Sequence, residues 1–171
     1  MTMTIACRTL PLLSLALVAC GQGGGGYVVD EVAAMATANC EASTSALRAP
    51  NAEMLPGRIC GACHRAGGQA DHHIWTVAGT VYGSPSASCN SGGLAGVKVE
   101  ILKMNGSVQA TLTTNRVGNF FTSQPIEFPI RVRLSKDGKM AEMISPQRTG
   151  ACASCHQNPG LSGAPGRVYL N

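Results

Sequence analysis

Two short strings in this chain share one spacing of cysteine and histidine. Residues 60–64 read CGACH and residues 152–156 read CASCH, so in each string two cysteines are separated by two residues and followed at once by histidine. This spacing is typical of a c-type haem attachment site, in which both thiols bond to one edge of the porphyrin and the imidazole binds the iron. The strings therefore predict two covalently attached haem c groups, one on each side of the segment between them.

The two strings resemble the haem segments of dihaem cytochromes c. The predicted attachment residues are Cys60, Cys63, Cys152 and Cys155, with His64 and His156 as proximal iron ligands. Two other uses of paired cysteines fit less well. A thioredoxin-type dithiol lies at the head of a helix within βαβ repeats, which this sequence lacks. A structural zinc site usually pairs two CxxC strings about 12 to 20 residues apart, whereas residues 64–151 separate the pairs here.

The supply of histidine suggests the ligand on the other side of each iron. The chain has four histidines, and once His64 and His156 are assigned only the adjacent His72 and His73 are left. Neighbouring residues of an extended segment point to opposite sides, so this pair is predicted to offer one imidazole to each of two irons. His72 alone is also close enough in sequence to cap the first haem, and a ligand to a neighbouring copy is a third arrangement. The runner-up distal ligands are thioether sulfurs, from Met54, Met140 or Met143.

The N-terminus predicts export from the cytoplasm. Residues 1–19 carry a short apolar run that is too brief to span a bilayer and has the length of a signal-peptide core. The run ends LVAC at residues 17–20, which resembles the lipobox of bacterial lipoproteins and implies a lipid on Cys20. By the same resemblance, Gly21 favours the outer membrane, and the Gly-rich residues 20–26 read as a tether. The alternative is an ordinary cleaved signal and a soluble periplasmic product.

Residues 74–145 show the pattern of a different kind of polypeptide. Apolar and polar residues alternate in short runs bounded by Gly, Pro, Asn and Ser, which predicts a small antiparallel β-sandwich. The segments VAGTVYG, GLAGVKVEIL and TLTTNRVGNFF resemble the carboxypeptidase regulatory-like, or prealbumin-like, domain. That resemblance implies a sandwich of about seven strands without an active site of its own. The predicted fold is mainly β, with haem segments at residues 27–73 and 146–171 that carry short helices, one of them within residues 30–49.

Counting cysteines leaves two without a role. Cys7 is removed with the signal, Cys20 takes the lipid, and four thiols take haem, so that only Cys40 and Cys89 remain. Outside the cytoplasm, two leftover thiols most simply pair. We therefore expect a disulfide between Cys40 and Cys89.

Taken together, these features predict an electron carrier. Each iron has one spare imidazole, so we expect no open site and no catalysis, only relay of single electrons between redox protein partners in the periplasm or at the outer membrane. The alternatives are a subunit of a polymeric extracellular cytochrome filament, or a small haem enzyme, such as a peroxidase or nitrogen-oxide reductase, with an open iron. The net charge of +4 is spread without a basic stripe, which argues against nucleic acid as a partner.

Overall fold

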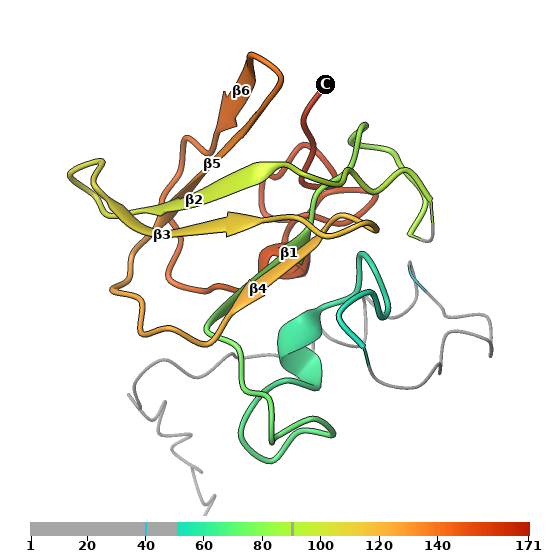
Figure 1. Cartoon of the computed structure of the whole chain (residues 1–171), viewed down its shortest axis with the longest axis vertical. Helices are drawn as coiled ribbons and strands as arrows, with labels where there is room; N and C mark the ends of the chain where they lie inside the picture. Colours follow the sequence, from blue (N-terminus) through green and yellow to red (C-terminus); the bar gives the residue numbers. More distant parts are fainter. Residues whose placement is uncertain (1–39, 41–50, 90) are drawn as a thin grey trace, which may run out of the picture.

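A computed structural model describes residue 40, residues 51–89 and residues 91–171 of the chain (Figure 1). The predicted signal peptide, the lipid-bearing Cys20, the tether and the helix expected within residues 30–49 lie outside the described residues, except for Cys40. Within the described part, no helix has the length and apolar character needed to cross a membrane.

Six strands form two antiparallel sheets. The strands are β1 (Val77–Thr80), β2 (Lys98–Leu102), β3 (Val108–Thr113), β4 (Asn119–Thr122), β5 (Arg131–Lys136) and β6 (Lys139–Glu142). Strands β1 and β4 make a two-stranded sheet, and the others make a four-stranded sheet in the order β3-β2-β5-β6. The mainly β fold with antiparallel sheets is thus confirmed. Six strands, rather than about seven, are found in the part of the chain that the structure describes.

The alternation in the sequence decides which side of each strand is buried. In β2, Val99 and Ile101 are fully buried, while Lys98 is exposed and bonded to Glu100. In β5, the side chains of Arg131 and Arg133 lie on the outer side and share the carboxylate of Glu142 on β6, each at 2.8 Å. The alternation of polar and apolar residues therefore separates a solvent-exposed face from a core face, as expected for a half-buried antiparallel strand.

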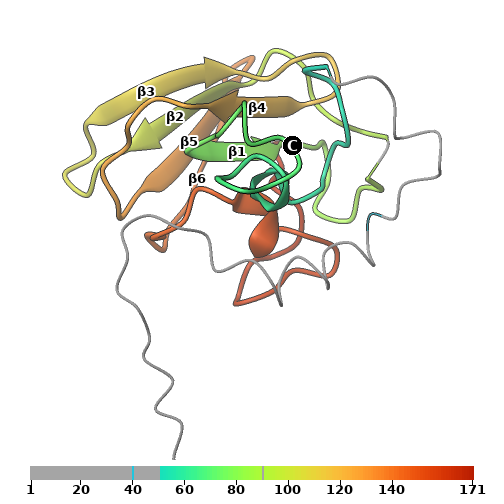
Figure 2. The same ribbon diagram turned by 90° about the horizontal axis from the view of Figure 1, so that it is seen from below.

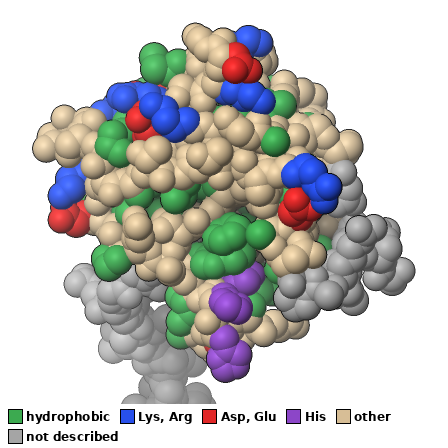
Figure 3. Space-filling view, in the orientation of Figure 1, with side chains coloured by type: hydrophobic (Ala, Val, Ile, Leu, Met, Phe, Trp, Pro, Cys, Tyr) green, Lys and Arg blue, Asp and Glu red, His purple; other side chains and the backbone are tan. Residues whose placement is uncertain are grey.

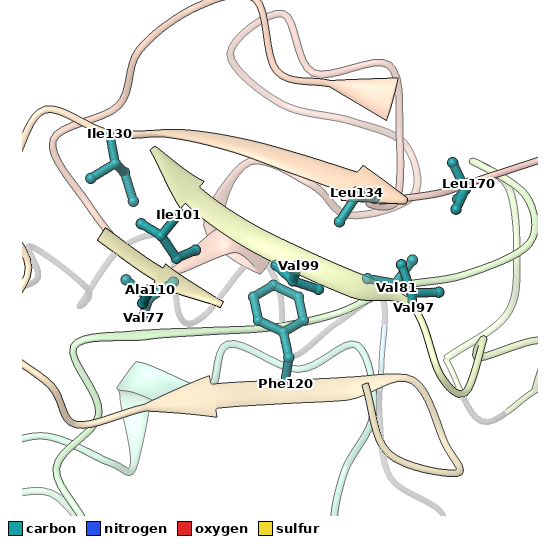
Figure 4. Packing of buried hydrophobic residues seen from close by; sticks show 10 residues of the cluster. All are labelled: Val77, Val81, Val97, Val99, Ile101, Ala110, Phe120, Ile130, Leu134 and Leu170. Carbon is teal, nitrogen blue, oxygen red and sulfur yellow. The ribbon is translucent and has the colours of Figure 1, made fainter. Parts of the chain in front are cut away.

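The core lies between the two sheets. Phe120 of β4 points toward Val99 of the larger sheet in Figure 4, and the ring is only 2 % exposed. The buried apolar cluster consists of Val77, Val81, Val97, Val99, Ile101, Ala110, Phe120, Ile130, Leu134 and Leu170. Most of its members are β-branched aliphatic residues, which pack well on a pleated surface.

The described residues of the two segments that flank the sheets contain little regular structure. Among the described residues, each segment carries one three-residue 3₁₀ turn, η2 (Cys60–Ala62) and η3 (Cys152–Ser154), and no longer helix. Figures 1 and 2 show both turns next to β1, on the side of the molecule away from the four-stranded sheet. The fold therefore brings the two cysteine motifs to one strand.

Candidate functional site

The two motifs have the same backbone conformation although they belong to distant parts of the sequence. The residues before the two turns have similar dihedral angles, with φ −74° and ψ 93° at Ile59 and φ −82° and ψ 76° at Ala151. The amide of His64 donates to the carbonyl of Cys60 at 2.9 Å, and the amide of His156 donates to that of Cys152 at 3.0 Å. Two independent segments thus present two thiols and an imidazole in one shared arrangement.

All four motif cysteines are free thiols and are partly buried. Burial raises the pKa of the Cys60 thiol to about 12, and burial together with the nearby Cys60 raises that of Cys152 to about 12. Both thiols are therefore neutral at physiological pH.

Each motif histidine is oriented by a backbone carbonyl. Nδ1 of His64 lies 2.8 Å from the carbonyl oxygen of His73, and Nδ1 of His156 lies 3.0 Å from that of Gly166. A carbonyl only accepts, so Nδ1 carries the hydrogen in both rings and Nε2 keeps its lone pair. Burial lowers the pKa of both imidazoles below the ordinary value, which favours the neutral form. A neutral imidazole held in this way has the tautomer needed for a metal ligand.

An aromatic stack fixes the plane of the first imidazole. The His64 ring lies on Trp75, with centroids 3.4 Å apart and planes 12° apart, and Trp75 lies in turn on Phe121 of β4, at 4.2 Å. The lone pair of Nε2 lies in the ring plane, so a partner stacked on the flat face does not cover it. The stack therefore restrains rotation and leaves the ligating edge free.

A hollow next to the first motif offers space for a flat apolar group. The hollow is partly open to solvent. Its lining includes Cys60, Cys63, His64, Trp75 and Phe121. The thiols and the imidazole of the first motif thus face one mainly apolar space, which fits a porphyrin.

Met54 lies in the lining of the same hollow. The turn that carries it is tied to the smaller sheet, since Nδ2 of Asn119 donates to the Met54 carbonyl at 3.0 Å. Next to it, Glu53 forms an ion pair with Arg116 at 2.6 Å. Of the predicted thioether ligands, Met140 is 68 % exposed on β6 and Met143 follows that strand, and neither lines the hollow.

The predicted distal histidines are found on the surface. The His72 side chain is 94 % exposed, with Nε2 3.6 Å from the Asp71 carboxylate, and His73 is also exposed. Figure 3 shows histidine side chains gathered beside a hydrophobic patch on this face of the molecule. The structure thus places the His72–His73 pair beside the first motif, where the His73 backbone, rather than its side chain, contacts His64.

Strand β1 anchors both motifs. The amide of Gly57, three residues before Cys60, donates to Oγ1 of Thr80 at 2.8 Å. Two residues earlier on the strand, the amide of Ala78 donates to the carbonyl of Gly150 at 2.9 Å. Alternate residues of a strand are about 7 Å apart, so the chain enters both motifs from neighbouring points.

The structure joins Cys40 and Cys89 by a disulfide with Cα atoms 5.5 Å apart.

Sequence reasoning missed three residues around the motifs. Trp75 and Phe121 form the stack on the first imidazole, and the guanidinium of Arg167 contacts both disulfide sulfurs. The position of Trp75, shortly after the first motif and just before the first strand, was a usable signal. Nothing in the sequence around Arg167 marks it as buried.

No protein-family model, curated protein or solved structure matches this chain. Among the described residues, no group of three or more His, Cys, Asp or Glu side chains is arranged to hold a metal ion.

Proposed function

We propose that this chain is a dihaem c-type cytochrome that relays single electrons in the periplasm or at the outer membrane. The observation that carries the proposal is the repeated geometry of the two motifs. In both, the histidine follows a 3₁₀ turn that holds the thiols, and its Nδ1 donates to a backbone carbonyl. Haem c supplies an iron that takes up and releases one electron.

The chain's own residues would hold the two groups in equivalent ways. Cys60 and Cys63 would form the thioethers at the first site and Cys152 and Cys155 at the second, with Nε2 of His64 and His156 as the proximal ligands. The backbone carbonyls of His73 and Gly166 keep these imidazoles in the required tautomer. Trp75 and Phe121 brace the first imidazole and exclude water from one side of it.

Electron relay requires the two redox groups to be close together, and both attachment segments are bonded to β1. Thr80 of this strand accepts a hydrogen bond from Gly57, and Ala78 donates one to Gly150. Both attachment segments are therefore fixed to one short, buried strand. A rigid spacing between the sites favours rapid electron exchange, because the sites need no large motion before each transfer. The four-stranded sheet then provides a surface for redox partners, and a lipid on Cys20 would hold the unit at the membrane.

We propose that the two irons have different sixth ligands. Met54 lines the hollow that His64 faces, so we propose its sulfur for the first iron. His72 and His73 would then serve the second iron or the iron of a neighbouring copy. The His72 side chain is 94 % exposed, which favours binding to the iron of a neighbouring copy. A second candidate function is therefore that of a subunit of a polymeric cytochrome filament.

The mass of the mature protein tests the first proposal. The chain would be expressed with a c-haem ligation system, and we expect the intact mass to include two haem groups and the spectrum to show a Soret band. The variants C60A/C63A and C152A/C155A should each lose one haem, while the control C40A/C89A should keep both. A mass equal to that of polypeptide and lipid, without Soret absorption, would refute the proposal.

Negative-stain electron microscopy separates the single relay unit from the filament. A filament that depends on an intermolecular imidazole should disappear in His72→Ala while both haems remain attached. Discrete particles for the wild-type chain at high concentration would instead exclude the filament.

A further inference from the structure

The guanidinium of Arg167 is a buried cation between the two haem segments. Its side chain is only 2 % exposed and is the largest fully buried side chain among the described residues. It follows Gly166, whose carbonyl holds the imidazole of His156. Arg167 is thus the direct neighbour of the residue that orients the histidine of the second motif.

The same guanidinium also reaches the first segment. Its Nη1 donates to the carbonyl of Gly57 at 3.3 Å, and Gly57 precedes Cys60 by three residues. Gly57 has φ +80°, and a Cβ at this position would lie 2.4 Å from the Tyr82 hydroxyl oxygen, so glycine is required for this close approach. One positive charge is therefore fixed next to the chain that leads into the first motif, on a residue that follows the second motif.

The contacts of Arg167 with the described residues include no carboxylate. Nη2 lies 2.9 Å from the sulfur of Cys89 and 3.2 Å from that of Cys40, and Nε donates to the carbonyl of Ala87 at 3.3 Å. The guanidinium carbon lies 5.5 Å from the centre of the Tyr82 ring. Among the described residues, the charge is thus balanced only by dipoles, sulfur and a π face.

Burial of an uncompensated charge is costly, and burial lowers the pKa of Arg167. The guanidinium nevertheless keeps its proton, because its ordinary pKa is far above the physiological range. If only hydrogen bonds were needed here, a neutral donor would supply them at lower cost. The retained charge therefore calls for an electrostatic explanation.

Resting on the proposed function, we infer that Arg167 raises the reduction potentials of both haem sites. A ferric site carries one more positive charge than a ferrous site, so a fixed neighbouring cation destabilises the oxidised form more than the reduced form. The interaction is strong because the surroundings have a low dielectric constant, and it is weakly screened by salt because the charge is buried. Arg167 is thus a residue that tunes potential and does not touch the reacting iron.

Spectroelectrochemical titration of the holoprotein at pH 7 tests this inference. Arg167→Gln removes the charge and keeps donors, while Arg167→Lys keeps the charge. We expect Arg167→Gln to increase the ferric-to-ferrous ratio at a fixed potential by about tenfold, a downward shift of about 59 mV for a one-electron couple. Arg167→Lys should stay within about a threefold change of the wild-type ratio, and both results should persist when salt is raised.

Unchanged potentials in Arg167→Gln, with both haems attached, would overturn the inference, as would an equal drop in Arg167→Lys. Should Arg167→Gln fail to fold, Ala87 offers a second route, because it is partly exposed and adjoins the guanidinium. Ala87→Glu should lower the potentials by supplying a counter-charge, whereas Ala87→Gln should not, and equal potentials in this pair would count against the inference. Absence of haem from the wild-type protein would instead refute the proposed function.

Discussion

Nδ1 of His64 lies 2.8 Å from the backbone carbonyl oxygen of His73, nine residues further along the chain. The segment between them folds back on itself, since the amide of Ala70 donates to the carbonyl of Cys63 at 3.0 Å. The amide of Trp75 also donates to the His64 carbonyl at 3.2 Å, which brings the indole onto the imidazole. A local loop therefore sets the tautomer and the plane of the first imidazole together.

The only tryptophan of the chain should report on the first haem. Trp75 lies in van der Waals contact with His64 and lines the hollow beside Cys60. A haem attached there would absorb at the wavelengths at which indole emits, so we expect very weak fluorescence from the holoprotein. The C60A/C63A variant should recover several times more emission than C152A/C155A, measured at equal protein concentration. Equal recovery in both variants would contradict the assignment of the hollow to the first haem.

The sixth ligand of the first iron is open to a direct spectroscopic test. Met54 is the one runner-up methionine that lines the hollow, so we expect a Met-to-iron charge-transfer band at the red edge of the visible spectrum of the ferric protein. Met54→Leu should abolish that band and lower the potential of one haem, because thioether ligation raises potential relative to bis-imidazole ligation.

Matched variants complete the test of the Met54 assignment. Met143→Leu, just after β6, should keep the band. His72→Ala and His73→Ala should also keep it. A low-temperature EPR spectrum with two bis-imidazole signals that is unaffected by Met54→Leu would exclude Met54 and return both distal positions to the histidine pair.

The sequence predicts those features that depend on local chemistry or on a short period. The two CxxCH strings mark the attachment residues, and the alternation of Val99 and Ile101 with charged neighbours marks the core face of β2. The Asp-Gly pair at residues 137–138 is typical of a hairpin turn, and it connects β5 and β6 with positive φ of 49° and 77°. Each of these signals is contained within a few residues.

Contacts between distant segments were not predictable in this way. The docking of Gly57 on Thr80 and of Gly150 on Ala78 joins segments from both ends of the chain to β1. Periodicity shows that a strand has two faces but does not identify what covers them. The burial of Arg167 was hidden for the same reason, since its partners include Gly57 and the disulfide sulfurs, which come from elsewhere in the sequence.

The disulfide should contribute substantially to stability because it closes a long loop. Cys40 and Cys89 are separated by 49 positions in the sequence, and cross-linking them removes many conformations from the unfolded chain. We expect the C40S/C89S variant to lose about 2–4 kcal/mol of unfolding free energy. Guanidinium denaturation followed by circular dichroism measures this loss, and a reductant should reproduce it in the wild-type protein. A loss below about 0.5 kcal/mol would show that the bond does not restrain the unfolded chain.

Gly79 should tolerate no side chain, because β1 packs there against both the core and the second motif. A Cβ at this position would lie 2.9 Å from the Cβ of Cys152 and 2.9 Å from the ring of Phe120, closer than real contacts allow. Gly79→Ala should therefore cost about 1–3 kcal/mol of unfolding free energy and displace the second motif. Gly83→Ala is the matched control, since its nearest neighbour would lie at an ordinary 3.7 Å and the change should stay within about 0.5 kcal/mol. Denaturation curves of the two holoproteins give the comparison, and equal stabilities would mean that the second motif is not seated against β1 as described.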